Sequence, residues 1–385
     1  MTYPELNDKN DKLKTPACSD ICLGHKDIES SLLQLYQAGR LPHAIVFAGP
    51  EGIGKATFAY RFIRFLLNRK HDHEKENQDM DSLFGELPDE TDSDASPGTM
   101  EISPESDVFA RVCSGGHPDL RVVERRCDEK SGRIKQTHDL KEIRSIASFL
   151  RMTPAEGGWR VALVDDAEAL NLYAQNALLK ILEEPPEQAI LILVTRSAGA
   201  LIPTIRSRAR VIEFTPLSDD DMGFLLENLD PDIPHSDKNL LASLSAGQMG
   251  LAMKYYEQGG LDIYTKLMQI LQDWPKLNWQ LIHKLGDESA QKSKTEFYAC
   301  FREVTLCVFH ALCRAKANRE PSPKLGSCDL PCTALYEETD LNTLIKAHDR
   351  LDGLYREAQK ANLDPKNVIL TSFIKILDSH HSKAA

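Results

Sequence analysis

Short runs of apolar residues alternate with helical patterns over the first half of the chain. The apolar runs are Ala44–Ala48, Asp119–Val123, Arg160–Val164, Ile190–Thr195 and Val211–Phe214. Runs of this length predict strands that are buried on both faces. Between them, apolar residues recur at helical spacing in Asp27–Tyr36, Phe58–Leu66, Asp139–Met152 and Ala174–Leu182. Strands that alternate with helices predict a parallel sheet with crossover helices on its faces, an α/β fold.

The second half of the chain has a different pattern. Strand signals fade after Pro216, and helical periodicity continues to the end. We therefore predict an α/β domain over residues 25–215, a small helical lid over 216–252 and an all-helical region over 253–385. The polar residues 1–24 are expected to form a flexible N-terminus.

One segment of the α/β domain carries the net charge of the protein. Residues 71–107 hold thirteen carboxylates and one basic residue, Lys75, which accounts for the whole formal charge of −12. Few apolar residues offset the entropy of ordering this segment, so we expect a disordered acidic insert. The rest of the chain is neutral, which argues against a strong DNA-binding surface on the isolated protein.

Composition also indicates in which cellular compartment the protein works and whether it binds zinc. No apolar run reaches the ~18 residues of a membrane span, and Met1–Cys18 lacks the apolar region of a secretion signal. Nine cysteines, an odd number, argue against a disulfide framework and for a reducing compartment, so we expect a cytoplasmic protein. Their spacing offers no set of four zinc ligands, so no zinc is expected.

The strongest chemical signal follows the first apolar run. Gly49-Pro-Glu-Gly-Ile-Gly54-Lys55 fits the pattern Gly-x4-Gly-Lys after a strand and at the start of a helix. Gly49, Gly52 and Gly54 let the backbone N–H groups surround anionic oxygens, and Lys55 adds a cation. The segment predicts a phosphate-binding loop with ATP as its cofactor.

The residue after Lys55 departs from this pattern. Ala56 replaces the Ser or Thr that normally supplies a hydroxyl to Mg²⁺. Thr57 is one residue further along and points about 100° away on a helix. We therefore predict a degenerate ATP site and do not expect Mg²⁺-assisted hydrolysis.

Two carboxylates, Asp165 and Asp166, follow the strand predicted over Arg160–Val164. P-loop proteins hold Mg²⁺ at such a strand end. Asp165 would be that ligand, and Asp166 would stand where a catalytic Glu is usual. Paired carboxylates at a strand end can also cap the next helix, but the upstream phosphate loop favours the functional interpretation.

Several motifs taken together resemble one family, the bacterial DNA polymerase III clamp loaders. The motifs are Gly39-Arg-Leu-Pro-His43, the phosphate loop, His117-Pro-Asp119, the Asp165 strand end, Asn176-Ala-Leu-Leu-Lys180-Ile-Leu-Glu-Glu-Pro-Pro186 and Ile205-Arg-Ser207-Arg208. The resemblance covers about residues 25–250 outside the acidic insert. It implies an AAA+ α/β module with a helical lid, followed by a helical collar domain that oligomerises.

Losses from the nucleotide site favour the delta-prime type within this family. These losses are Ala56, Asp166 in place of Glu, and Gly250 at the position of the family's lid arginine. The cysteines of the family's zinc module are also missing. The resemblance then implies that the chain alone is neither an active ATPase nor a polymerase, although it would be part of a nucleotidyltransferase holoenzyme. The implied partners are gamma/tau and delta subunits, the sliding clamp and, through the complex, primed DNA. No membrane partner is implied.

The resemblance also assigns roles to individual residues. Ser207 and Arg208 would present an arginine finger to ATP bound by a neighbouring subunit, although Arg208 in a simple surface ion pair is the alternative. Thr195 stands where the family has a polar residue that senses the γ-phosphate. Alternatively, it is a β-branched residue that simply suits the end of a strand.

Two other functions remain open. The first is an ATP-hydrolysing motor subunit of gamma/tau type, which the presence of Lys55 and Asp165 supports. A P-loop phosphotransferase of small molecules would leave Asn176–Pro186 unexplained.

Overall fold

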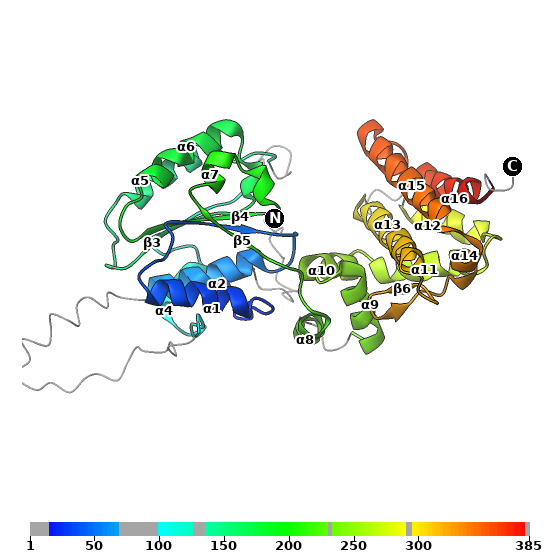
Figure 1. The fold of residues 1–385 in the computed structure, drawn as a ribbon, viewed down its shortest axis with the longest axis horizontal. Coiled ribbons are helices and arrows are strands. Elements are labelled where there is room, and N and C mark those ends of the chain that lie inside the picture. Colours follow the sequence, from blue (N-terminus) through cyan, green and yellow to red (C-terminus); the bar gives the residue numbers. More distant parts are fainter. Residues whose placement is uncertain (1–14, 69–98, 126–134, 230–232, 290–294, 382–385) are drawn as a thin grey trace, which may run out of the picture. The chain divides into compact units, whose positions relative to one another are not determined.

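The structure is a computed structural model that divides into two compact units, Met1–Leu217 and Ser218–Ala385. The residues that it describes are 15–68, 99–125, 135–229, 233–289 and 295–381. The first unit contains the sheet and the second is almost entirely helical (Figure 1). Among the helices within these ranges, none is both long and apolar enough to cross a membrane.

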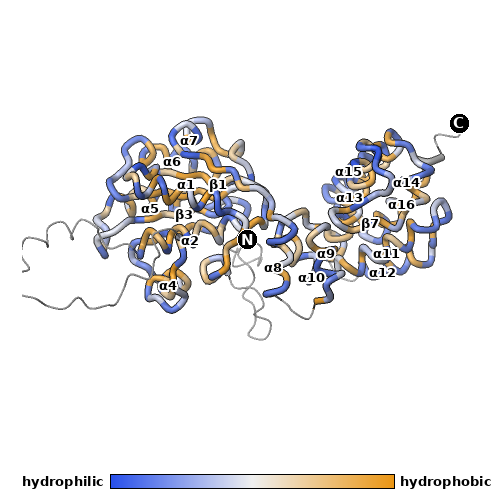
Figure 2. The backbone as a smooth tube through the Cα atoms, turned by 60° about the horizontal axis from the view of Figure 1, so that its bottom comes forward, coloured by the Kyte–Doolittle hydropathy of each residue, from blue (hydrophilic) through white to orange (hydrophobic). Residues whose placement is uncertain are grey.

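The first unit is built on a five-stranded sheet in the order β2-β3-β4-β1-β5. The strands are β1 (Ala44–Ala48), β2 (Leu120–Val123), β3 (Arg160–Val164), β4 (Ala189–Thr195) and β5 (Arg210–Glu213). All neighbouring strands pair in parallel, which confirms the predicted sheet. Every residue of β1, β3 and β4 is buried, because helices cover both faces, and β1 and β3 are largely orange in Figure 2. The prediction of strands buried on both faces is wrong for β2 and β5, which are only partly buried because they form the two edges of the sheet.

Helices cover the two faces of the sheet (Figure 1). One face carries α1 (Lys26–Gln37), α2 (Lys55–Asn68) and α4 (Asp107–Cys113), and the other carries α5 (Leu140–Leu150), α6 (Leu172–Glu183) and α7 (Pro203–Arg206). Alternate residues of a strand point to opposite faces, so Phe47 packs in the first core cluster and Val46 in the second. Two short 3-10 helices, η1 (Ala167–Ala169) and η2 (Ala198–Ala200), follow β3 and β4.

The second unit consists of helices and one small hairpin over its described residues. The helices are α8 (Asp219–Leu229), α9 (His235–Ser245), α10 (Met249–Glu257), α11 (Gly260–Gln272), α12 (Trp279–Ser289), α13 (Thr295–Ala317), α14 (Thr333–Glu338), α15 (Leu341–Ala361) and α16 (Pro365–His381). The hairpin pairs β6 (Lys324–Leu325) with β7 (Cys328–Asp329). The expected boundary between lid and collar, at residues 252 and 253, falls inside α10. The division into lid and collar remains a prediction.

Parts of two segments expected to be disordered are packed in the structure. Residues 1–14 lie outside the described residues, but Ala17 and Cys22 pack against the core of the first unit. The acidic insert was expected over 71–107, of which 69–98 lie outside the described residues. Met100 is fully buried, and its N–H donates to the Glu29 carboxylate at 2.7 Å. Scattered apolar residues therefore order the end of a segment whose average composition predicts disorder.

The expectation of unpaired cysteines needs a correction as well. Cys18 and Cys113 form a disulfide, with their Cα atoms 4.7 Å apart and a sequence separation of 95 residues. An odd number of cysteines excludes complete pairing but not a single bridge. Six other cysteines of the described residues are free, and Cys127 lies outside them.

Candidate functional site

The glycine-rich loop connects β1 to α2 at the carboxyl edge of the sheet. Gly49 has a φ of 151°, and a Cβ atom there would lie 2.6 Å from the carbonyl oxygen of Phe214. Gly54 has a φ of 93°, a conformation that a side chain would strain. Ile53 is fully buried and anchors the loop between these two glycines. The loop thus has the strand–loop–helix geometry that its sequence predicts.

Lys55 is directed back onto its own loop. Its Nζ donates to the carbonyl oxygen of Gly49 at 2.8 Å and also to that of Pro50. Burial lowers the pKa of Lys55, while the carboxylates of Glu168 and Asp165 oppose that shift. The ammonium group would have to exchange these carbonyls for phosphate oxygens when a nucleotide binds.

The donor set of this loop fits a phosphate better than a magnesium ion. The backbone amides and Lys55 would hold phosphate oxygens, as in other P-loop proteins. Ala56 offers no hydroxyl to a metal, and the half-buried Thr57 is the next residue on α2. Mg²⁺ would therefore depend on Asp165 and on the nucleotide itself. Within the described part of the chain, no group of three or more His, Cys, Asp or Glu residues is arranged to hold a metal ion.

Asp165 and Asp166 follow β3 at the same edge of the sheet, and their pKa values are shifted in opposite directions. Burial, together with the neighbouring charge of Asp166, raises the pKa of Asp165 to about 6. Burial alone would also raise the pKa of Asp166, but the pKa lies below its ordinary value, and the hydrogen bonds and the charge of Arg125 contribute to this lowering.

The Asp166 carboxylate is already engaged. It accepts a hydrogen bond from Arg125 Nε at 2.8 Å and a second from Nη2 at 2.5 Å. Its backbone has a φ of 52°, the left-handed region that non-glycine residues rarely adopt. Both hydrogen bonds go to one carboxylate oxygen, Oδ2, and an ion-paired carboxylate is a weak general base, so this geometry does not favour Asp166 as the base of a hydrolytic site.

Thr195 ends β4 next to the phosphate loop. Its carbonyl oxygen accepts a hydrogen bond from the Gly49 N–H at 3.3 Å, across the pair of strands β1 and β4. Its side chain is 1% exposed, and Oγ1 donates to the Ser197 carbonyl at 3.1 Å. The hydroxyl therefore holds the turn after β4.

The structure also brings Arg196 to the phosphate loop, a residue that the sequence did not single out. Its guanidinium contacts the carboxylate of Glu51 in the loop at 2.8 Å and that of Glu168 in η1 at 3.1 Å. All three side chains are at least partly exposed. An arginine next to a strand-end threonine was the only sequence signal, and both of its partners lie more than 25 residues earlier in the chain.

Ser207 and Arg208 lie between α7 and β5, at the amino edge of the sheet. Arg208 Nη2 is 3.2 Å from a carboxylate oxygen of Glu183, the last residue of α6, and Nη1 donates to the Thr204 carbonyl at 3.2 Å. The Arg208 side chain is 38% exposed, and that of Glu183 is 54% exposed. The parallel register sets Arg210 beside Ile45, at the start of β1, whereas the phosphate loop follows the end of β1. Arg208 and the phosphate loop therefore lie at opposite edges of one sheet.

His117-Pro-Asp119 has a structural role in this chain. Asp119 is 1% exposed and forms an ion pair with Arg160 at 2.8 Å. Its carboxylate also accepts hydrogen bonds from the N–H groups of Ala155 and Glu156, at 2.8 and 3.0 Å. The motif thus fixes the loop that leads into β3. Of the remaining predicted positions, Gly250 is the second residue of α10, in the other unit.

Comparisons with known proteins find similarity to subunits of DNA polymerase III. A family model described as DNA polymerase III, delta subunit, matches residues 93–218. DNA polymerase III subunit delta' of Pseudomonas aeruginosa is 31% identical over 56% of this chain and 56% of its own length. The Escherichia coli delta' subunit is 28% identical over 66% of this chain and 68% of its own length. The gamma/tau subunit of Mycobacterium bovis is 28% identical over 56% of this chain and 31% of its own length.

A solved structure gives a weaker similarity. A gamma subunit-related protein of Thermotoga maritima has a TM-score of 0.36 and 16% identity, over 91% of this chain and 99% of its own length, too low to carry an inference. The parallel sheet with its glycine-rich loop between β1 and α2 gives the first unit the α/β architecture of a P-loop protein. Over the ranges matched, the chain is similar to delta' and gamma/tau subunits of DNA polymerase III. It spans only about half of the length of the Pseudomonas relative.

Proposed function

We propose that this chain is a delta-prime-type subunit of the clamp loader that lends Arg208 to ATP bound by a neighbouring subunit. The observation that carries the proposal is the position of Arg208 at the amino edge of the sheet. The five residues of β1 separate that edge from the phosphate loop by about 16 Å. An arginine side chain is shorter than this, so the Arg208 guanidinium can reach only a phosphate held by another molecule.

The chemistry of Arg208 suits this role. A guanidinium on a transferred phosphate stabilises the charge of the transition state, an effect of about 10³–10⁵ in rate in P-loop systems. The ion pair with Glu183 is partly exposed, and such pairs stabilise a protein by only about 0–1 kcal/mol. Exchange of the carboxylate for a phosphate therefore costs little, and Ser207 and Thr204 can keep the side chain in place.

The phosphate loop of this chain supports a subunit that does not hydrolyse ATP by itself. Ala56 lacks the metal-binding hydroxyl, Lys55 is held by carbonyl oxygens, and Asp166 is bound to Arg125. ATP would occupy a degenerate site, where the glycine amides and Lys55 hold its phosphates. The chain would act as a fixed member of the assembly and not as its motor or polymerase.

The partners follow from the proposed role. They are gamma/tau and delta subunits, the sliding clamp and, through the assembled complex, primed DNA. The assembly would load the clamp onto DNA during replication, in the cytoplasm. The related proteins named delta' and gamma/tau support the first of these partners.

The alternative is an ATP-hydrolysing motor subunit of gamma/tau type. It is supported by Lys55 and Asp165, which lie in one site, and by the 28% identity to a gamma/tau subunit. A motor would need Lys55 for hydrolysis, and this requirement separates the two functions.

DNA-stimulated ATP hydrolysis by the reconstituted clamp loader tests the proposal. Arg208→Ala in this subunit should lower the rate by one or more orders of magnitude, whereas Lys55→Ala should leave it unchanged. Arg206→Ala, which removes an exposed arginine two residues away, is the matched control. Loss of activity with Lys55→Ala instead would identify a motor subunit. Unchanged activity with both variants would exclude both functions.

A further inference from the structure

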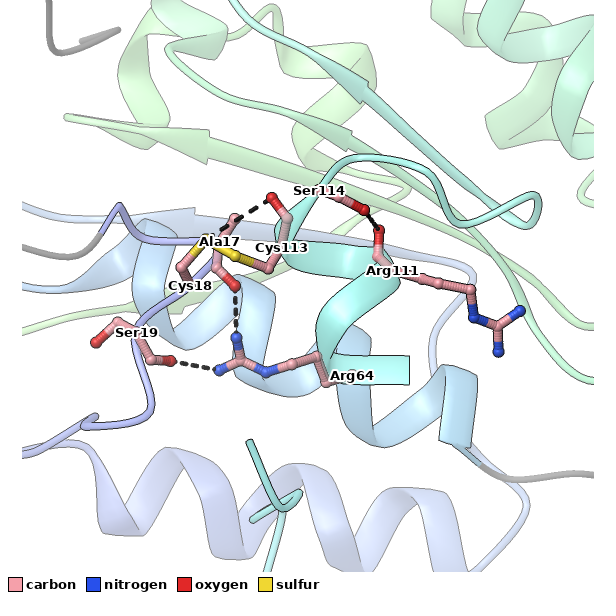
Figure 3. The surroundings of a disulfide bond; sticks show 7 residues. All are labelled: Ala17, Cys18, Ser19, Arg64, Arg111, Cys113 and Ser114. Carbon is pink, nitrogen blue, oxygen red and sulfur yellow. Dashed lines mark hydrogen bonds between the residues drawn. A yellow bond between two sulfur atoms is a disulfide. The ribbon is translucent and has the colours of Figure 1, made fainter. Parts of the chain in front are cut away.

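The segment before α1 is fastened to the first unit on both sides of Cys18 (Figure 3). We call residues 15–24 the N-terminal strap. Cys18 is disulfide-bonded to Cys113, the last residue of α4. The guanidinium of Arg64 in α2 donates to the Ala17 carbonyl at 2.7 Å and to the Ser19 carbonyl at 2.8 Å. The strap, α2 and α4 therefore meet at this one cysteine.

Arg64 makes the surroundings of Cys18 electropositive. Its side chain is buried, with 3% of the residue exposed, and the guanidinium carbon lies 4.3 Å from the ring centroid of Phe109 in α4. Burial lowers the pKa of Arg64 to about 10, so the group stays charged at neutral pH. A fixed positive charge next to a cysteine favours its thiolate, the form that attacks disulfides.

The two bonded cysteines lie at the border between the core and the surface of the first unit. Cys18 and Cys113 are partly exposed, and the residues that follow Cys113, Ser114 to Gly116, are exposed. The Cys113 carbonyl oxygen is 3.7 Å from Cys18 Sγ, within reach of a thiol hydrogen once the bond is reduced. The strap has one more thiol, Cys22. Burial raises the pKa of Cys22 to about 11, which keeps it protonated and a poor competitor for exchange.

The strap leads directly to the phosphate loop. His25, the first residue after it, is buried, and its Nε2 lies 2.9 Å from the carbonyl oxygen of Ile53 in the loop. The His25 ring also packs on Phe214, with the two centroids 4.6 Å apart. Opening of the strap would therefore affect the phosphate loop through the contacts of His25.

We propose that Cys18 and Cys113 are a reversible thiol–disulfide site that sets how firmly the strap is held against this unit. The oxidant is a low-molecular-weight disulfide such as oxidised glutathione. The Cys18 thiolate attacks it, forms a mixed disulfide and releases one thiolate. The Cys113 thiolate then attacks Cys18 Sγ and releases the second thiolate. Two electrons pass from the cysteine pair to the external disulfide, and the two cysteine protons appear on the two released thiols.

Reduction has a local consequence. It opens a covalent loop of 95 residues, while the Arg64 hydrogen bonds and the packing of Ala17 remain. The unit therefore stays folded, and the strap opens more often. Because α4 and α2 keep their own contacts with the core, the increase in opening is confined to the strap and to the loop that His25 touches.

The test uses the full chain, equilibrated at a series of ratios of reduced to oxidised glutathione. Alkylation followed by mass spectrometry reads the state of each cysteine, and amide hydrogen exchange reads the strap and residues 49–54. We expect the Cys18–Cys113 bond to form and disappear reversibly. Strap amides should exchange about tenfold faster or more in the reduced protein, with a smaller increase in the phosphate loop.

Variants of single cysteines distinguish the proposed pair from the third thiol of the strap. Cys22→Ser should respond to glutathione like the unchanged protein. Cys18→Ser and Cys113→Ser should show the fast strap exchange at every ratio. The proposal is overturned if Cys18 and Cys113 are alkylated at every ratio, if either pairs with a different cysteine, or if strap exchange is the same in both redox states.

Discussion

Arg208 and Glu183 form an ion pair at 3.2 Å that joins two distant motifs at the amino edge of the sheet. Glu183 belongs to the Asn176–Pro186 motif and ends α6, and Arg208 belongs to the Ser-Arg motif before β5. The negative end of the α6 dipole adds to the attraction for the guanidinium. The carboxylate occupies the place at the guanidinium that a phosphate would take.

Glu183→Gln should therefore differ from Arg208→Ala. Without the carboxylate, Arg208 keeps its hydrogen bond to Thr204 but loses the group that competes with phosphate. In the reconstituted assembly, we expect ATP hydrolysis at or above the unchanged rate. The free energy of unfolding of the isolated chain should change by less than about 1 kcal/mol.

Glu184→Gln is the control for this experiment, because Glu184 pairs with Arg151 at 3.5 Å and not with Arg208. If Glu183→Gln lowers hydrolysis as much as Arg208→Ala does, the carboxylate does not compete with phosphate. Glu183 would then be required to position the guanidinium.

Arg125→Ala should raise the pKa of Asp166. The substitution removes two hydrogen bonds and a positive charge, and the burial that raises the pKa of this carboxyl remains. Carboxyl NMR titration of the two proteins measures the shift. Arg121→Ala, an exposed arginine of β2, should leave the titration of Asp166 unchanged. An Asp166 pKa that does not move in Arg125→Ala would show that the ion pair is absent in solution.

Asp119→Asn should be strongly destabilising. The Asp119 and Arg160 side chains are 2% and 6% exposed, so the substitution leaves the Arg160 charge buried without its partner. Loss of one partner of a buried pair costs about 3–5 kcal/mol. Urea unfolding of the sheet-containing unit measures this cost. Glu184→Gln, at the exposed pair with Arg151 in the same unit, should cost less than about 1 kcal/mol, and similar costs for both variants would contradict the buried pair.

His117 should make the first unit less stable in mild acid. Burial lowers the pKa of His117, although the Glu156 carboxylate 3.7 Å away partly offsets the shift. The unfolded chain then binds a proton at His117 more readily than the folded chain does. The contribution of this neutral histidine is complete above pH ~6.5 and decreases as the pH falls through its unfolded and then its folded pKa.

Urea unfolding at several pH values between about 5 and 8 measures that contribution. His117→Asn should reduce the loss of stability toward low pH. His283→Asn, at an exposed position of α12, should keep the pH dependence of the unchanged protein. Parallel pH profiles for the unchanged protein and His117→Asn would rule out a role of His117 in the acid response.

Local patterns of the sequence were sufficient to predict the strands, the helices and the glycine-rich loop of the first unit. The apolar run Arg160–Val164 is β3, and Asp139 accepts a hydrogen bond from the Lys141 N–H as the N-cap of α5. The phosphate loop was found in the same way, because the strand, the glycines and Lys55 are adjacent in the chain. These features depend on the period of apolar residues and on the spacing of motif residues, which the sequence shows without knowledge of contacts between distant residues.

The average composition of a segment predicted whether it is ordered less well than local patterns predicted strands and helices. It predicted flexibility for residues 15–24 and for the end of the acidic insert, yet Ala17 and Met100 pack against the core. A single apolar side chain can order a polar segment when a pocket in the folded unit accepts it. Such a pocket exists only after the sheet and its helices have formed.

The sequence by itself determined the parallel sheet, the glycine loop and the loss of the metal-binding hydroxyl at Ala56, since each depends on residues close in the chain. Only the tertiary structure decided that Arg125 binds Asp166, that Cys113 pairs with Cys18, and that Arg208 lies across the sheet from the phosphate loop. These relationships join residues that are tens to more than a hundred positions apart. They arise from the order of the strands and the packing of helices on the sheet, which no local pattern encodes.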